Sequence, residues 1–361
     1  MKINITIVGG GNVGTQFVVH FAEKGYNVIL YTSNPQEFQS RLFIVDSKDK
    51  IIHTATDYTI TNSPKEAFLK ADIIFITVPA FAIDKIADEI YPYVHKKMRI
   101  VCIPGTGGIE WFFKKHIQKG IELFGLQRVP SVARLVKYGS VVRCVGYRSD
   151  LFIGGIASET SLIVMCKILF EVFNIKCTPL PNYLSVTLTP SNPILHTARL
   201  YNLFSDYYDG KVYKNISLFY EDWNDDVSKI LFLMDTELQN ICQQLHEFDL
   251  KSVVSLKKHY ESETPQQLTK KIKSIEGFKG LKTPMLKIAD GYIPDFNSRY
   301  FIADFPFGLN ILVQIAGLIG VECPSMNKVM NWYINQRPQE KSFSFIDFGI
   351  KERKDFIEYY L

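Results

Sequence analysis

A glycine-rich turn near the N-terminus limits the fold more than any other segment of the chain. Residues 9–14 read Gly-Gly-Gly-Asn-Val-Gly, which fits the pattern G-x-G-x-x-G. Residues 2–10 form a β-rich run into this turn, and residues 12–25 continue from it with helical spacing. A strand, a tight glycine turn and a helix in this order are typical of a dinucleotide-binding βαβ unit.

Each glycine of the turn has its own task in this interpretation. Gly9 permits the tight turn, Gly11 lets the backbone approach a pyrophosphate, and Gly14 allows the helix to pack closely on the strand. The free amides at the helix start, on Asn12 and Val13, are then offered to the phosphates. The alternative is a plain tight turn that binds nothing.

The rest of the first half alternates short apolar strands with helical segments. The expected strands cover residues 26–32, 71–79 and 98–105. The expected helices cover residues 63–71 and 82–94. Because the strands are almost continuous in Ile, Val and Phe, we expect a parallel sheet that is covered on both faces.

The pattern changes at about residue 185. Strand signals become weak, and long segments with helical spacing cover residues 192–208, 226–248 and 307–320. A proline-rich stretch at residues 177–184 marks the change. We therefore predict an α/β chain: an N-terminal Rossmann domain with a doubly wound parallel sheet at residues 1–182, followed by an all-α C-terminal domain at residues 183–361.

The composition argues against several functional classes. A net charge of +4 is too small to indicate nucleic-acid binding, and the basic cluster at residues 270–273 has the spacing of a solvated helix face. The apolar runs are too short, and too often broken by proline, to predict a membrane span. The six cysteines form no Cys-x-x-Cys pair, so we expect a reduced, cytoplasmic protein without a metal site.

The end of the second expected strand bears on the choice of cofactor. NAD-specific sites usually carry an acid there for the ribose hydroxyls, whereas this strand ends in Thr32-Ser33-Asn34. Thr32 and Ser33 can hydrogen-bond either cofactor, and the lack of a carboxylate leaves room for a 2′-phosphate. We therefore favour NADP and keep NAD as the alternative.

Two later loops are expected at the same edge of the sheet. Thr77-Val78-Pro79 ends one buried strand, and residues 104–108 end the next. Ligands of open α/β sheets gather where the strands end, so Val78, Pro79 and Gly105 are candidates for contact with the cofactor. Ordinary turn chemistry is the alternative for each loop.

A histidine follows the helix start expected at Ser191-Asn192-Pro193. His196 lies one turn into this helix, on an otherwise apolar stretch. The helix dipole disfavours a charged imidazole there, so proton transfer near neutral pH requires a carboxylate partner. Without such a partner, His196 is a packed core residue.

Asp304, in an aromatic run, is the candidate partner. An Asp in this run is costly to bury unpaired, although it also suits the cap of a helix that begins near Pro306. Arg299 lies five residues earlier and suits a bidentate pair with a substrate carboxylate. A structural ion pair is the alternative for Arg299.

Taken together, these motifs resemble the NAD/NADP octopine/nopaline (opine) dehydrogenase family. The similarity covers essentially the whole chain and rests on the N-terminal glycine pattern and on the segments TVPAFAIDKI, IPGTGGIEW, FGLQRVPSVAR, NPILH and SRYFIADFPFGLNILVQIAGLIGVECPSM. Its most specific parts are the element Asn192-Pro193-x-x-His196 and the spacing Arg299-x-x-x-x-Asp304. The family combines a Rossmann domain with a helical domain, as predicted above from the pattern.

The resemblance also implies a reaction. Opine dehydrogenases join the amine of an amino acid to a 2-oxo acid, usually pyruvate, and reduce the product with NAD(P)H to a secondary-amine dicarboxylate. By carry-over, His196 is the acid/base and Asp304 its partner. Arg299 holds a carboxylate, and Asn192 contacts substrate or orients the helix start. Ala303 departs from the family, which often has Glu there, so a substrate contact of that Glu is in doubt.

Two other functions remain open. A reductase of a simple 2-oxo acid or sugar phosphate shares the architecture and needs no amine, and a non-catalytic dinucleotide sensor binds the cofactor without turnover. The acids around Trp223 either attract a cationic amino acid or form a solvated loop and helix start; they are Glu221, Asp222, Asp225 and Asp226. We expect small-molecule substrates, no nucleic acid and no membrane as partners, with a homodimer as one assembly open to the chain.

Overall fold

The computed structural model describes residues 2–190 and 192–361 of the chain. These residues form two compact units that divide between Thr187 and Leu188. The predicted boundary, after residue 182, falls before the short helix α7 (Leu184–Thr187), which belongs to the first unit. Tyr183 holds this segment there, because its hydroxyl donates to the Gly105 carbonyl at 3.1 Å. Ser191, part of the expected helix start, lies outside the described residues.

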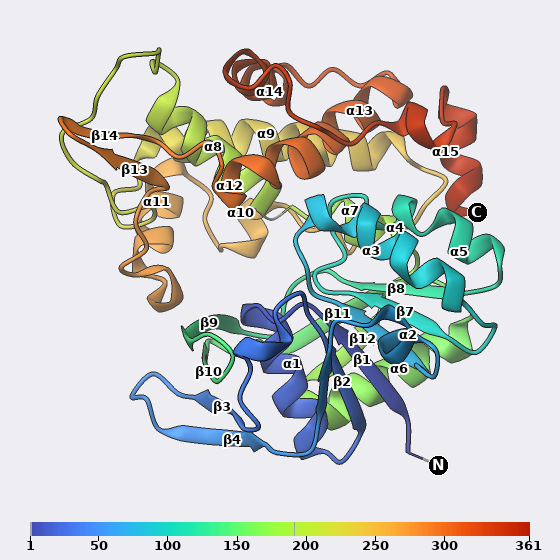
Figure 1. The fold of residues 1–361 in the computed structure, drawn as a ribbon. Coiled ribbons are helices and arrows are strands. Elements are labelled where there is room, and N and C mark those ends of the chain that lie inside the picture. Colours follow the sequence, from blue (N-terminus) through green and yellow to red (C-terminus); the bar gives the residue numbers. More distant parts are fainter. Residues whose placement is uncertain (1, 191) are drawn as a thin grey trace. The chain divides into compact units, whose positions relative to one another are not determined.

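An eight-stranded sheet forms the centre of the first unit (Figure 1). Its strands are β1 (Asn4–Val8), β2 (Asn27–Tyr31), β5 (Thr59–Thr61), β6 (Ile73–Ile76), β7 (Arg99–Cys102), β8 (Glu122–Leu126), β11 (Asp150–Ile156) and β12 (Lys176–Pro179). Six of them run parallel in the order β5-β2-β1-β6-β7-β8, and β11 adds to β8 antiparallel. The chain order reverses between β1 and β6, which is the switch point where such sheets bind ligands.

Helices cover both faces of this sheet. They are α1 (Asn12–Glu23), α2 (Pro64–Phe68), α3 (Ile83–Ile90), α4 (Ile109–Phe112), α5 (Lys114–Gln118) and α6 (Glu159–Phe173). Phe17 of α1 packs on Phe75 of β6 and on Phe173 of α6, with ring centroids 5.6 Å and 4.9 Å away. Thr6 of β1 points to the opposite face, because its hydroxyl donates to the Ala67 carbonyl of α2 at 2.5 Å. The predicted doubly wound sheet is therefore confirmed.

A smaller sheet beside α1 is not predicted by the sequence pattern (Figure 1). Its strands are β3 (Leu42–Val45), β4 (Ile51–Ala55), β9 (Val132–Lys137) and β10 (Val141–Val145), in the order β4-β3-β10-β9. Two residues of α1 bind β9 and the residue before it. Asn12 Oδ1 accepts from the Leu135 amide of β9 at 2.8 Å, and Gln16 Nε2 donates to Ser131 Oγ at 2.8 Å.

The second unit is mainly helical, as predicted. Its helices are α8 (Asn192–Phe204), α9 (Asp225–Gln244), α10 (Leu256–His259), α11 (Pro265–Ser274), α12 (Arg299–Ile302), α13 (Asn310–Ile319), α14 (Pro324–Gln336) and α15 (Arg353–Tyr360). The long helix α9 contacts α8, α11, α13 and α14 (Figure 1). A hairpin of β13 (Met285–Ile288) and β14 (Gly291–Pro294), which the pattern does not predict, completes the unit.

One helical stretch in this unit is apolar over an unusual length. Among the described residues, only Arg299–Ile319 reaches the length and hydropathy of a membrane-crossing helix, and half of its most apolar window is buried inside the protein. Buried core helices share these properties. The stretch also contains Asp304, whose carboxylate has a specific partner described below.

Candidate active site

The glycine turn between β1 and α1 has the geometry of a phosphate cradle. Gly9 adopts φ +103°, a conformation that other residues rarely take. A Cβ on Gly14 would lie 1.7 Å from the Gly9 carbonyl oxygen, so only glycine lets the helix approach the turn so closely. At Gly11 a Cβ would meet nothing within 4 Å, and no side chain caps α1 there. The turn therefore offers open space and helix-terminal amides, which fit the pyrophosphate of NAD(P).

The loop after β6 is joined to this turn. Thr77 Oγ1 donates to the Val8 carbonyl at 2.8 Å and lies 3.3 Å from that of Gly9. A Cβ on Gly9 would lie 2.8 Å from a Val78 methyl group, so the two loops are in contact at the switch point. Val78 and Pro79 are partly exposed there, next to the residues expected to bind the cofactor.

Other proposed cofactor residues have structural reasons of their own. A Cβ on Gly105 would meet the Gly125 Cα, the Tyr183 hydroxyl and a Val186 methyl group within 3.0 Å, so internal packing requires this glycine. At the end of β2, Thr32 is buried and Ser33 is exposed. The Asn12 side-chain oxygen accepts from the Leu135 amide, which ties the start of α1 to β9.

In the helical unit, the structure brings His196 and Asp304 together. His196 Nδ1 lies 2.7 Å from Asp304 Oδ2, although the residues are 108 positions apart. The imidazole side chain is 7% exposed and the carboxylate 17%, so the pair is shielded from water but not sealed from it. Donation from Nδ1 to the carboxylate fixes the tautomer and leaves Nε2 as the basic nitrogen.

Tyr220 completes this arrangement and is absent from the sequence prediction. Its hydroxyl lies 2.8 Å from His196 Nε2. Its ring stacks on Phe278, with centroids 4.0 Å apart, and Tyr300 packs edge-on to the imidazole at 4.6 Å. Tyr220 belongs to the run LFYEDW, whose aromatic content indicates burial but carries no spacing relative to His196. The polar groups of Asp304, His196 and Tyr220 are thus packed among the aromatic rings of Phe278 and Tyr300.

Asp304 does not serve as a helix cap in the way that its position suggests. It precedes a short π-helix, Phe305–Leu309, and its side chain makes no capping hydrogen bond. The carboxylate turns to His196 instead. Single π turns are frequent at functional sites, because they shift the register of a helix by one residue.

Arg299 and Asn192 are both exposed in the same unit. Arg299 begins α12, one residue before Tyr300, and pairs with no carboxylate among the residues that the structure describes. Asn192 is the first residue of α8, one turn before His196. Both side chains are thus accessible from solvent near residues of the dyad.

The acidic residues around Trp223 support local structure. Asp222 Oδ2 accepts from the Leu218 amide at 2.7 Å, and Glu221 Oε2 accepts from the Gly280 amide at 2.6 Å. Asp225 and Asp226 occupy the first turn of α9, where acids favour the helix dipole. These contacts favour the solvated loop and helix start over a site for a cationic substrate.

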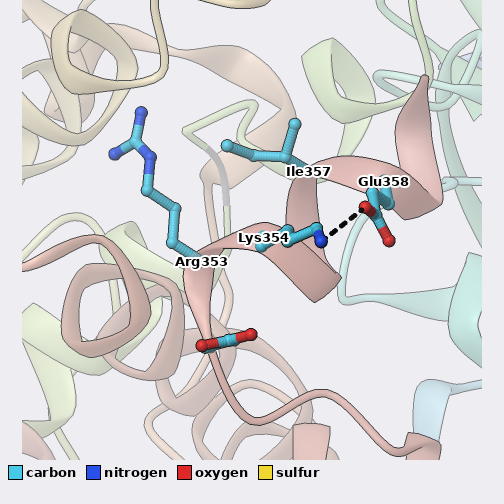
Figure 2. Close-up of a pocket in the computed structure, with 5 residues that line it drawn as sticks. Arg353, Lys354, Ile357 and Glu358 are labelled. Carbon is cyan, nitrogen blue, oxygen red and sulfur yellow. Dashed lines mark ion pairs between the residues drawn. The ribbon is translucent and has the colours of Figure 1, made fainter.

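A hollow on α15 has none of these features. It is lined by Glu352, the N-cap of α15, and by Arg353, Lys354, Ile357 and Glu358 of that helix (Figure 2). Lys354 pairs with Glu358 at 3.7 Å across it. Since no dyad residue lines this hollow, it is a shallow charged surface and not the reaction site.

Comparisons with known proteins agree with this fold. Residues 179–335 match the alpha-helical domain of NAD/NADP octopine/nopaline dehydrogenase, and residues 5–135 match ketopantoate reductase PanE/ApbA. The chain is 27% identical to tauropine dehydrogenase of Arabella iricolor, over 79% of this chain and 76% of the relative. It is 26% identical to opine dehydrogenase of Haliotis discus hannai, over 94% of this chain and 91% of that one.

A solved structure shows the same architecture. Octopine dehydrogenase with NADH and L-arginine superposes with a TM-score of 0.80 at 22% identity, covering 93% of this chain and 89% of that chain. These comparisons together indicate an NAD(P)-dependent dehydrogenase that acts on the CH–NH group of its donor. Within that class, the chain is similar to the NAD/NADP octopine/nopaline (opine) dehydrogenase family, whose alpha-helical domain matches residues 179–335.

Proposed function

We propose that the chain catalyses the NAD(P)H-dependent reductive condensation of an amino acid with a 2-oxo acid, pyruvate in the first instance. The products are a secondary-amine dicarboxylate, NAD(P)⁺ and water. The observation that carries the proposal is the 2.7 Å contact between His196 and Asp304 in the helical unit. Relatives named tauropine, opine and octopine dehydrogenase support the class of reaction.

The proposed roles follow from the contacts of each residue. Asp304 orients the imidazole through Nδ1, so His196 holds and delivers a proton at Nε2. Until substrate binds, the Tyr220 hydroxyl hydrogen-bonds to this nitrogen and so positions the His196 ring. Arg299, exposed and without an ion-pair partner among the described residues, binds the carboxylate of the 2-oxo acid. Asn192 either contacts the substrate or holds the start of α8.

The cofactor supplies the hydride that reduces the condensed carbon–nitrogen bond. We propose that it binds at Gly9, Gly11 and Gly14, with the amides of Asn12 and Val13 at its phosphates. Thr32 and Ser33 lie where the ribose is expected, and Val78, Pro79 and Gly105 where the nicotinamide is expected. With no acid at residues 32–34, NADPH is the first cofactor to test and NADH the second.

The test is a matrix of amino acids against 2-oxo acids, in which NADPH and NADH loss are followed in parallel. Oxidation that requires both substrates, together with a new secondary amine in the mass spectrum, is the expected result. It identifies the amino acid, the 2-oxo acid and the cofactor in one experiment.

Two other outcomes would replace the proposal. Oxidation with a 2-oxo acid alone, unchanged by any amine, would identify a simple reductase. Cofactor binding without turnover under any combination would identify a dinucleotide sensor. We further propose a cytoplasmic enzyme; all six cysteines are free thiols in the structure, as a reducing compartment favours.

A further inference from the structure

Three metal-ligating side chains meet in the first unit, where the last turn of α1 faces β4. His20 and Glu23 are three positions apart on α1, so they lie on one face of the helix. His53 comes from the middle of β4. One ligand atom from each residue lies within 4.8 Å of the other two, and no other group of this kind occurs among the residues that the structure describes.

The contacts within this cluster are close. His53 Nδ1 lies 2.7 Å from Glu23 Oε2, and the two imidazole rings have centroids 4.7 Å apart. His20 Nε2 lies 3.3 Å from the Tyr147 hydroxyl, which adds a fourth polar group. The His20 ring is buried, whereas the side chains of His53 and Glu23 are 33% and 38% exposed, so the cluster is open to solvent on one side.

The three side chains supply a donor set of a known kind. Two imidazoles and one carboxylate are a donor set that Zn²⁺ accepts, with a water molecule in the fourth position.

We propose that His20, Glu23 and His53 bind a divalent transition-metal ion, with Zn²⁺ as the first candidate. The ion would join α1, the helix that begins at the glycine turn, to β4 of the smaller sheet. It would replace a half-exposed Glu23–His53 ion pair, which by itself contributes little to stability. The expectation of a chain without metal rested on cysteine spacing, which is blind to a site made of His and Glu.

The experiment uses the full chain after treatment with a chelator. Zn²⁺ affinity is measured by competition with a chromophoric chelator, Co²⁺ absorption reports the ligand types, and the melting temperature is recorded with and without Zn²⁺. Glu23→Gln and His53→Ala remove ligands that are partly exposed. His246→Ala, at an exposed position of the helical unit, is the matched control for the loss of a histidine.

We expect one Zn²⁺ per chain and a higher melting temperature with Zn²⁺. We also expect both ligand variants, but not the control, to lose at least about tenfold in Zn²⁺ affinity. Three results would overturn the proposal. They are no Zn²⁺ binding by the wild-type chain, unchanged affinity in both ligand variants, or a thiolate-to-cobalt absorption band, since the cluster holds no cysteine. None of these readouts depends on turnover.

Discussion

The imidazole of His196 is held at both nitrogens, by Asp304 at Nδ1 and by Tyr220 at Nε2. A ring held at only one nitrogen can still rotate or exchange tautomers. Two contacts, together with the edge-on packing of Tyr300, leave a single orientation. Nε2 therefore points in a fixed direction before any substrate binds, which lowers the cost of reaching a reactive geometry.

Replacing either member of the dyad should remove proton transfer and leave cofactor binding intact. We expect His196→Gln and Asp304→Asn to lower kcat by ~10²–10⁴-fold, the usual contribution of a general acid–base group. The NAD(P)H dissociation constant, measured by fluorescence titration, should change little, because the cofactor turn lies in the other unit. Unchanged turnover in His196→Gln would refute the assigned role.

Loss of the Tyr220 hydroxyl should have a smaller effect. Tyr220→Phe keeps the stacked ring and removes one hydrogen bond to Nε2, which is worth about 1 kcal/mol. We expect kcat to fall by roughly five- to tenfold, with a displaced pH profile of kcat because His196 has lost a partner. A purely structural role would instead lower the melting temperature and leave the pH profile in place.

At the scale of elements, two glycines at the start of α1 differ in the space around them: Gly14 has no room for a side chain, whereas Gly11 has. Gly14→Ala would place a Cβ 1.7 Å from the Gly9 carbonyl, so the turn must open. We expect a loss of stability of about 1–3 kcal/mol, as in other overpacked sites, as well as weaker cofactor binding. Urea unfolding and fluorescence titration measure the two effects.

Gly11→Ala is the matched control for that change. Its Cβ meets no protein atom within 4 Å, and the backbone φ of −81° is open to alanine. The variant should fold with normal stability but bind NAD(P)H at least about tenfold more weakly, because the methyl group faces the expected pyrophosphate. Normal cofactor affinity in Gly11→Ala would show that the phosphates lie elsewhere.

Helix α14 depends on a buried carboxylate from α9. Glu237 is 7% exposed, and its two oxygens accept from the amides of Ser325 and Met326 at 2.7 Å and 2.9 Å. Glu237→Ala leaves both amides without this partner, so we expect a loss of about 1–3 kcal/mol in the free energy of unfolding. Glu237→Gln, which keeps one acceptor oxygen, should lose less; equal stability of all three proteins in urea would contradict the capping role.

The alternation of strands and helices could be predicted because the parallel strands are buried on both faces. Residues 71–79 and 98–105 read as apolar runs and became β6 and β7. The smaller sheet could not, since most residues of β4 and β9 are exposed or only partly buried. Such strands are held by partners distant in sequence and carry little local signal.

In the candidate site, too, some residues could be predicted from the sequence and others could not. The pairing of His196 with Asp304 could be predicted, because a histidine near a helix start and an acid in an aromatic run each require a partner. Tyr220 could not, because its role arises from the way that the segment before α9 folds onto α8. The metal-ligating cluster combines a helix with a strand that the pattern did not predict, so its geometry exists only in the folded unit.

On the scale of the whole molecule, one buried acid should impart a pH dependence to stability. Burial raises the pKa of Asp235 from 3.8 to about 6. The hydrogen bond that its carboxylate accepts from the Leu256 amide lowers the pKa, but by less. Between these values the folded chain keeps a proton that the unfolded chain has lost. Protonated Asp235 therefore favours folding at low pH, and this contribution is lost as pH rises through the window. The free energy of unfolding falls by about 3 kcal/mol at most.

Asp235→Asn isolates that contribution, because asparagine retains an acceptor oxygen for Leu256 and does not titrate. The difference in unfolding free energy between variant and wild type should shift in favour of the variant as pH rises from about 4 to about 7. Urea denaturation at both pH values measures it. A difference that does not vary with pH would mean that Asp235 titrates normally.

The placement of the three tryptophans has a practical consequence for following these units. Trp111 is fully buried in α4 of the first unit, whereas Trp223 and Trp332 belong to the second. The Trp223 indole stacks on Tyr220, with ring centroids 6.2 Å apart, and so lies one ring away from His196 Nε2. The chain thus contains its own optical probes: emission from Trp111 reports the nucleotide-binding half, and emission from Trp223 reports events at the imidazole.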